Sequence, residues 1–136
     1  MSWTSASKFV AYTTCVFLTP FCLAATFDPT SYLSLSSIGL EPAASATLTG
    51  LSNIRGSIGG LRLGIIAMIA VGTYGRRRDL CLGAAILVAA VAMGRFISLA
   101  LDGWELLSFV TASSEVMITA AMLHLSRSFS AASEDS

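Results

Sequence analysis

The chain has 136 residues, of which 54% are apolar and only 12% are charged, and its formal net charge at pH 7 is zero. A soluble domain carries about 25% charged residues, so this composition excludes a water-facing surface of ordinary polarity and predicts a membrane as the solvent. The length suits one domain, and the chain has no polybasic surface of the kind that binds nucleic acid.

The first apolar segment, residues 9–27, contains no charged side chain. It approaches the roughly 20 apolar residues that cross about 30 Å of hydrocarbon, and Pro20 should kink it by removing a backbone donor. The alternative is a cleaved signal peptide, with Lys8 as its basic region and Cys22-Leu23-Ala24 as a loose cleavage site. We favour a retained helix, because the basic region is weak and the apolar segment is long.

Residues 28–52 form the one long connection, rich in serine and threonine. The alternation of apolar and polar residues over 32–40 predicts a short amphipathic segment at the membrane interface, followed by a turn at Glu41-Pro42. Three more crossings are predicted at 54–74, 80–101 and 104–125, and the polar residues 126–136 are predicted to be a disordered tail. The predicted fold class is therefore all-α. We expect residues 1–125 to form an integral membrane four-helix bundle with short loops and one longer outer loop between the first two helices.

Basic residues near the crossings predict the orientation of this multi-pass protein. Arg76, Arg77 and Arg78 lie between the second and third crossings, and the positive-inside rule places them in the cytoplasm. Lys8 and Arg127 flank crossings on the same side. Four crossings then place both termini in the cytoplasm.

Five ionisable residues lie within or at the edge of the apolar segments: Arg55, Arg62, Arg95, Asp102 and Glu115. At about 1.5 Å per residue, all five fall in the outer half of the membrane. A charge at the centre of a membrane helix costs roughly 2.5–3.5 kcal/mol on insertion scales. These groups must therefore pair with one another or face a wet cavity, which predicts a polar pocket between the second, third and fourth helices.

Helical spacing groups these side chains by face. Arg55 and Arg62 are seven residues apart and share a face, as do Arg95, Ser98 and Asp102. The fourth crossing carries a polar stripe made of Ser108, Thr111, Glu115 and Thr119. The predicted ligand-binding residues are Arg55, Arg62, Arg95, Ser98, Asp102 and Glu115. By count one positive charge is left over, which could attract an anionic headgroup, a carboxylate or a phosphate. In the alternative reading an Arg–Glu pair only fixes helix register, and Arg55 extends to the interface.

Small residues recur every four positions at Ser52, Gly56, Gly60 and Gly64. Such spacing lets helix backbones approach closely, and these glycines lie on a different face from Arg55. We expect packing within the bundle more than dimerisation, although a homo-oligomer or a membrane-protein partner remains an alternative.

No motif in the chain predicts a metal site or a cofactor. Cys15, Cys22 and Cys81 fit no zinc spacing, His124 is the single histidine, and no phosphate-binding loop is present.

The pattern of glycines and charged residues resembles the domain of unknown function 4345 family of small four-helix membrane proteins. The residues that carry the resemblance are Asn53, Arg55, Gly59-Gly60-Leu61, Gly64, Gly94-Arg95, Ser98, Asp102-Gly103 and Glu115, with Gly39-Leu40-Glu41-Pro42 before them. The resemblance is most convincing over residues 53–125 and implies a four-helix integral membrane protein. It implies no activity.

These observations predict a protein that binds a lipid or amphipathic small molecule in the outer-half pocket. Arg62 and Arg95 would hold the polar head, with Asp102 and Glu115 positioning them. The first alternative is a membrane enzyme of isomerase, cyclase or oxidase type acting on a lipophilic substrate, with Glu115 as its acid/base. The second is a structural helper that packs another membrane protein through Gly56, Gly60 and Gly64.

Overall fold

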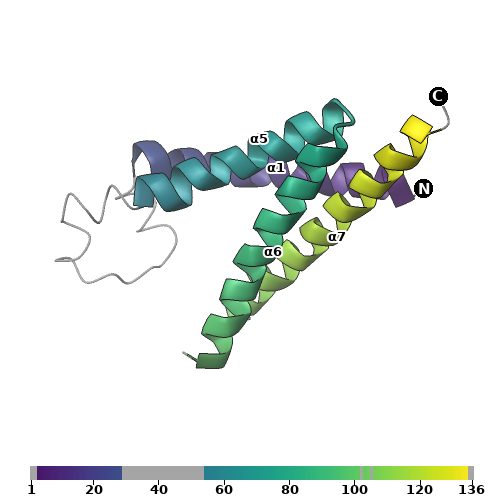
Figure 1. Cartoon of the computed structure of the whole chain (residues 1–136). Helices are drawn as coiled ribbons and strands as arrows, with labels where there is room; N and C mark the ends of the chain where they lie inside the picture. The colour runs from purple at the N-terminus through teal and green to yellow at the C-terminus, as the bar shows by residue number, and fades with distance from the viewer. Residues whose placement is uncertain (1–2, 29–53, 102, 105, 135–136) are drawn as a thin grey trace. The chain divides into compact units, whose positions relative to one another are not determined.

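The computed structural model describes residues 3–28, 54–101, 103–104 and 106–134, and over these residues the chain is all-helical (Figure 1). The elements are α1 (Trp3–Phe27), the π-helix η1 (Ile54–Gly60), α5 (Leu61–Tyr74), α6 (Arg78–Leu101) and α7 (Leu106–Glu134). Because η1 continues directly into α5, the two together occupy the predicted second crossing. The predicted interfacial segment at 32–40, the turn at Glu41-Pro42 and Asp102 lie outside the described residues.

Three of the helices are long and apolar enough to cross a membrane: Trp3–Phe27, Arg78–Leu101 and Ser108–Ser130. The helix Ile58–Tyr74 is apolar but shorter. In the most apolar windows of the three long helices only 17% to 28% of the residues are buried. Most of their apolar surface therefore faces outward, the reverse of what a protein in water requires.

α7 extends beyond the predicted end of the fourth crossing at residue 125. We expected residues 126–136 to be disordered, but the helix continues to Glu134. Leu125 and Ser126 are buried, so the packed face of the helix continues past the apolar segment. The Ser126 hydroxyl donates to the Leu123 carbonyl at 2.9 Å and the Ser128 hydroxyl to the His124 carbonyl at 2.9 Å, so these serines satisfy their hydroxyls within the helix.

The chain divides into two compact units, and the division falls within α1 and α5. One unit comprises Met1–Thr14 and Met68–Ser136, and the other comprises Cys15–Ala67. In the first unit α6 and α7 lie side by side (Figure 1). The buried face of α6 consists mainly of small residues, and that of α7 includes larger ones. The buried residues are Cys81, Ala84, Ala85, Val88 and Ala92 on α6, and Ala112, Ile118, Ala121, Met122 and Leu125 on α7.

α5 and α6 are joined by a tight turn at Gly75–Arg77, so Arg78 and Asp79, which we placed in the loop, already belong to α6. The Arg77 amide donates to the Gly72 carbonyl at 2.9 Å, and the Gly75 amide donates to the Val71 carbonyl at 2.8 Å. This pattern closes the C-terminus of α5 as a Schellman motif does. Arg76 occupies the left-handed position of that motif, with φ of 50°, where glycine is the usual residue.

Close approach of helices in the second unit occurs at Gly59. A Cβ at Gly59 would collide with Thr26 Oγ1 and would lie 3.0 Å from the Thr26 Cα and N on α1. The Thr26 hydroxyl donates to the Cys22 carbonyl at 2.8 Å, so the helix backbone holds it in place. Ala24, Ala25 and Ile58 pack together beside this contact.

The glycine repeat does not make the helix contact expected for it. A Cβ at Gly56 or Gly64 would meet no atom within 4 Å among the described residues, and one at Gly60 would meet only the Arg55 carbonyl. In the first unit the close approach lies instead at Gly72, where a Cβ would be 3.1 Å from the Cys81 N and Sγ. A repeat of small residues predicts where backbones could meet, whereas the observed contacts depend on how the helices are placed.

The turn predicts that Arg76→Gly stabilises the protein. Relief of the left-handed strain should exceed the entropy that glycine adds to the unfolded chain, giving a net gain of about 0.5–1 kcal/mol. The matched control is Arg77→Gly, which removes the same charge from a residue without positive φ and should lower stability. Thermal unfolding in detergent, followed by circular dichroism, measures both. Equal shifts in the two variants would contradict the role assigned to the turn.

The contact at Gly59 predicts that Gly59→Ala destabilises the packing of η1 on α1 by about 1–3 kcal/mol through overpacking. Gly64→Ala adds the same methyl group where the described residues leave open space, so it should be neutral or slightly stabilising. The two melting temperatures, compared in one detergent, test this. A similar fall in melting temperature in both variants would mean that close packing at Gly59 is not the cause of the loss.

Candidate functional site

An ion pair joins α6 and α7. Arg95 Nε donates to Glu115 Oε1 at 3.0 Å. The exposed fraction of the side chain is 29% for Arg95 and 16% for Glu115, so both are largely removed from solvent. Arg95 lies one turn from the buried Ala92, and Glu115 lies one turn from the buried Ala112. The packed faces of the two helices therefore place the pair at their contact.

Glu115 has a second oxygen that the pair does not use. Oε2 is buried and has no hydrogen-bond partner among the described residues. A buried carboxylate oxygen without a donor is costly, because desolvation is not offset by a hydrogen bond. Within the described chain, Glu115 thus offers one satisfied oxygen and one open acceptor.

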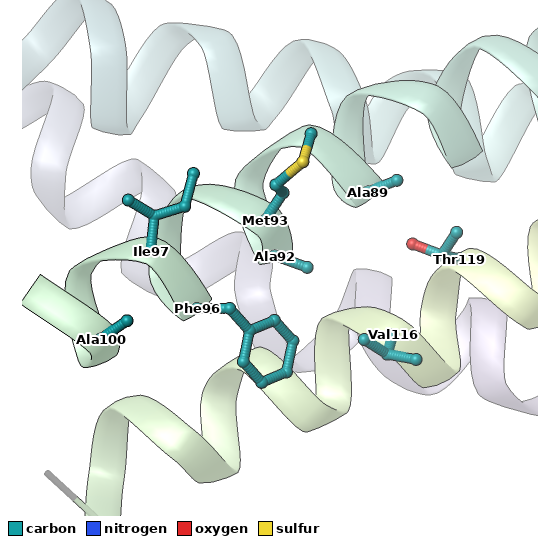
Figure 2. A pocket seen from close by; sticks show the side chains of 8 residues that line it. All are labelled: Ala89, Ala92, Met93, Phe96, Ile97, Ala100, Val116 and Thr119. Carbon is teal, nitrogen blue, oxygen red and sulfur yellow. The ribbon is translucent and has the colours of Figure 1, made fainter. Parts of the chain in front are cut away.

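A groove runs along α6 and α7 beside this pair. Its volume is about 450 Å³, within the range of small-molecule sites. Figure 2 shows that most of the lining comes from α6 and that the Phe96 ring points toward α7. The lining residues are Ala89, Ala92, Met93, Phe96, Ile97, Ala100, Val116 and Thr119. All except Thr119 are apolar, and the groove is shallow and widely open, since Met93, Phe96, Ile97 and Val116 are exposed.

Thr119 connects the groove to the ion pair. Its hydroxyl donates to the Glu115 backbone carbonyl at 2.9 Å. Because that proton is committed, Thr119 Oγ1 presents only acceptor lone pairs to the groove. Val116 and Thr119 both line the groove, and Glu115 is adjacent to the first and one turn before the second. Neither Arg95 nor Glu115 lines the groove itself, and the hydrogen bond from Thr119 links the groove to the backbone of Glu115.

The other predicted site residues are placed differently. Arg55 is exposed and Arg62 is half-buried, and both belong to the unit Cys15–Ala67. Ser98 is exposed on α6, one turn from Arg95, and has an interaction of its own. Asp102 lies outside the described residues. Of the six predicted ligand-binding residues, the structure thus shows a direct contact for Arg95 with Glu115, and the roles of the others stay predictions.

Metal-binding clusters and other unpaired buried atoms were the remaining candidates for a site. No group of three or more His, Cys, Asp or Glu side chains that could hold a metal occurs in the described part of the chain. Thr73 Oγ1 is a second buried atom without a partner there, at the end of α5 and apart from the groove-lining residues. The groove and the ion pair are therefore the strongest candidates for a functional site in the described part of the chain.

Comparison with known proteins adds no relative: no family model, no curated protein and no solved structure matches the chain.

Sequence reasoning found the ion pair but missed the groove. The signal was present in the third crossing, where Ala89, Met93, Phe96 and Ala100 recur at three- and four-residue spacing. Alternation of small and large residues along one helix face can leave a hollow beside a neighbouring helix. The spacing does not show where the neighbouring helix lies.

The ion pair predicts strong coupling between its two members. Arg95→Met and Glu115→Leu should each lower stability by about 2–3 kcal/mol, because each leaves a largely buried charge without its partner. The double variant should lose less than the sum of the two losses, by about 1.5 kcal/mol or more. Unfolding of the four proteins in one detergent measures this. Additive losses would mean that the contact contributes no stability.

Proposed function

We propose that the chain is an integral membrane protein with four crossings and both termini in the cytoplasm. Three helices of sufficient length and apolarity support membrane insertion, and Arg76, Arg77 and Arg78 support the orientation. Trp104, which precedes α7, and Phe109 in the first turns of α7 have tilted rings with centroids 4.8 Å apart. Such aromatic residues suit the opposite, outer interface.

Within this setting, the proposed function is binding of a lipophilic small molecule or lipid in the α6–α7 groove. The observation that carries the proposal is an apolar groove of about 450 Å³ whose one polar lining residue, Thr119, donates to the backbone carbonyl of Glu115. The groove supplies apolar contact for the body of the ligand. The polar atoms at its edge supply orientation, as in typical small-molecule sites.

A catalytic role for Glu115 is the second candidate. The open Oε2 favours it, because a general acid or base must have an atom free for proton transfer. In this reading an isomerase, cyclase or oxidase would act on the same lipophilic molecule. Arg95 would be a positioning residue that holds the carboxylate through Oε1.

The resemblance to the domain of unknown function 4345 family remains a proposal that suits both candidates. A structural helper that packs a partner through Gly56, Gly60 and Gly64 is a third candidate. The open space beside Gly56 and Gly64 in the described structure supports it.

Native mass spectrometry tests the binding proposal. We expect the purified protein to carry a small molecule that survives delipidation. Ala89→Phe fills the groove and should abolish this adduct. Ala90→Phe adds the same ring to the next residue of α6, which does not line the groove, and should keep the adduct. The same ordinary lipids in all three proteins would contradict a specific site. If Glu115 is catalytic, Glu115→Gln should carry the unreacted substrate, which chromatography of the released molecule distinguishes from the product even where an isomerisation leaves the mass unchanged.

A further inference from the structure

The turn between α5 and α6 concentrates positive charge in three consecutive residues, Arg76, Arg77 and Arg78, which we call the basic turn. Asp79 is the acidic residue beside them, and all four side chains are exposed. No described carboxylate forms a salt bridge with any of the three guanidinium groups. Their charge is therefore available to a partner outside the described chain.

The backbone of the basic turn does not favour arginine. Arg76 has φ of 50°, at the left-handed position that closes α5, and glycine takes such a position at the least steric cost. Residues held in strained backbone conformations concentrate where the strain serves a function. A function of the Arg76 guanidinium would account for an arginine where the backbone prefers glycine.

Tyr74 indicates the depth of the basic turn in the bilayer. It is the last residue of α5 and is 86% exposed, and tyrosines of membrane helices are enriched at the level of the headgroups. The arginines that follow Tyr74 then lie at or beyond that level, beside the lipid phosphates. In the orientation proposed above this is the cytoplasmic leaflet, whose anionic lipids attract basic residues next to a membrane helix.

From the unpaired charge, the strained backbone and the position of Tyr74, and resting on the proposed membrane insertion, we propose that the basic turn binds the phosphate of an anionic phospholipid of the cytoplasmic leaflet. A planar guanidinium can donate two hydrogen bonds to one phosphate, which gives a geometric specificity that a point charge lacks. This site is distinct from the α6–α7 groove, because none of its residues lines the groove.

Native mass spectrometry of the full-length protein in nanodiscs tests the proposal. The nanodiscs contain equal amounts of dioleoyl-phosphatidylglycerol and dioleoyl-phosphatidylcholine, which share their chains and differ in their headgroups. The measured quantity is the ratio of the anionic to the neutral lipid adduct on the released protein, and we expect it to favour phosphatidylglycerol. Arg76→Gly should lower this ratio about tenfold, because a hydrogen bond to a charged group contributes binding of that order.

Arg76→Gly is informative because it should stabilise the fold while it weakens lipid binding, so unfolding would not explain a lower ratio. Arg77→Gln removes a second guanidinium without positive φ and should give a similar fall. Each variant keeps two of the three arginines, which preserves the expected orientation. The matched control is Arg127→Gln, which removes one exposed cation from α7. Its contribution is long-range attraction that salt screens, so the ratio should fall much less.

The outcomes separate this inference from the proposed function. Equal adducts of the two lipids on the unaltered protein, or equal falls in Arg76→Gly and Arg127→Gln, would overturn the inference. Displacement of phosphatidylglycerol by inorganic phosphate at constant ionic strength would assign the basic turn to a soluble anion and would also overturn it. Ligand binding in the groove would still stand, because it is tested by the adduct lost in Ala89→Phe. A protein that does not remain in the nanodisc would overturn the proposed membrane insertion itself.

Discussion

The contact between Arg95 and Glu115 is the constraint on which the α6–α7 pair depends. Each charge alone would be expensive in an apolar environment, and each is tolerable because the other lies 3.0 Å away. The pair helps to fix the register of the two helices, because the buried face of α6 consists mainly of small apolar side chains that by themselves specify register weakly. Arg95 occupies one oxygen of Glu115, and the other oxygen is buried without a donor among the described residues.

Much of the fold could be predicted from the sequence, because uncharged apolar segments of membrane-spanning length have few alternatives to helix. The second helix begins at Ile54 as predicted, whereas the third begins at Arg78, two residues before the predicted start. The extension of α7 could not be predicted in this way. Residues 126–134 are rich in serine and alanine, a composition that is also common in coil, and the sequence does not show that Leu125 and Ser126 are buried at the start of this extension.

The site was only partly predictable, for a related reason. Arg95 and Glu115 stand out because ionisable residues within apolar segments need partners, so their chemistry alone draws attention to them. A groove has no such signature, since it depends on the distance and angle between two helices. The glycines illustrate the same limit. Gly56 and Gly64 have the spacing of a contact face, but Gly59 is the residue that meets α1, and spacing alone does not distinguish a glycine beside a neighbour from one that faces outward.

The length of α7 has a consequence for how the protein would sit in a bilayer. A helix of 29 residues is about 44 Å long, compared with a hydrocarbon core of about 30 Å. Tilt alone would have to approach about 47° to hide the excess, beyond the range of about 0–40° seen for membrane helices. The C-terminal turns of α7, including Arg127, would therefore lie beyond the hydrocarbon and within the headgroup layer, because a bilayer with its headgroups is about 40–45 Å thick. The serine-rich end of this helix would then meet polar headgroups in place of lipid tails.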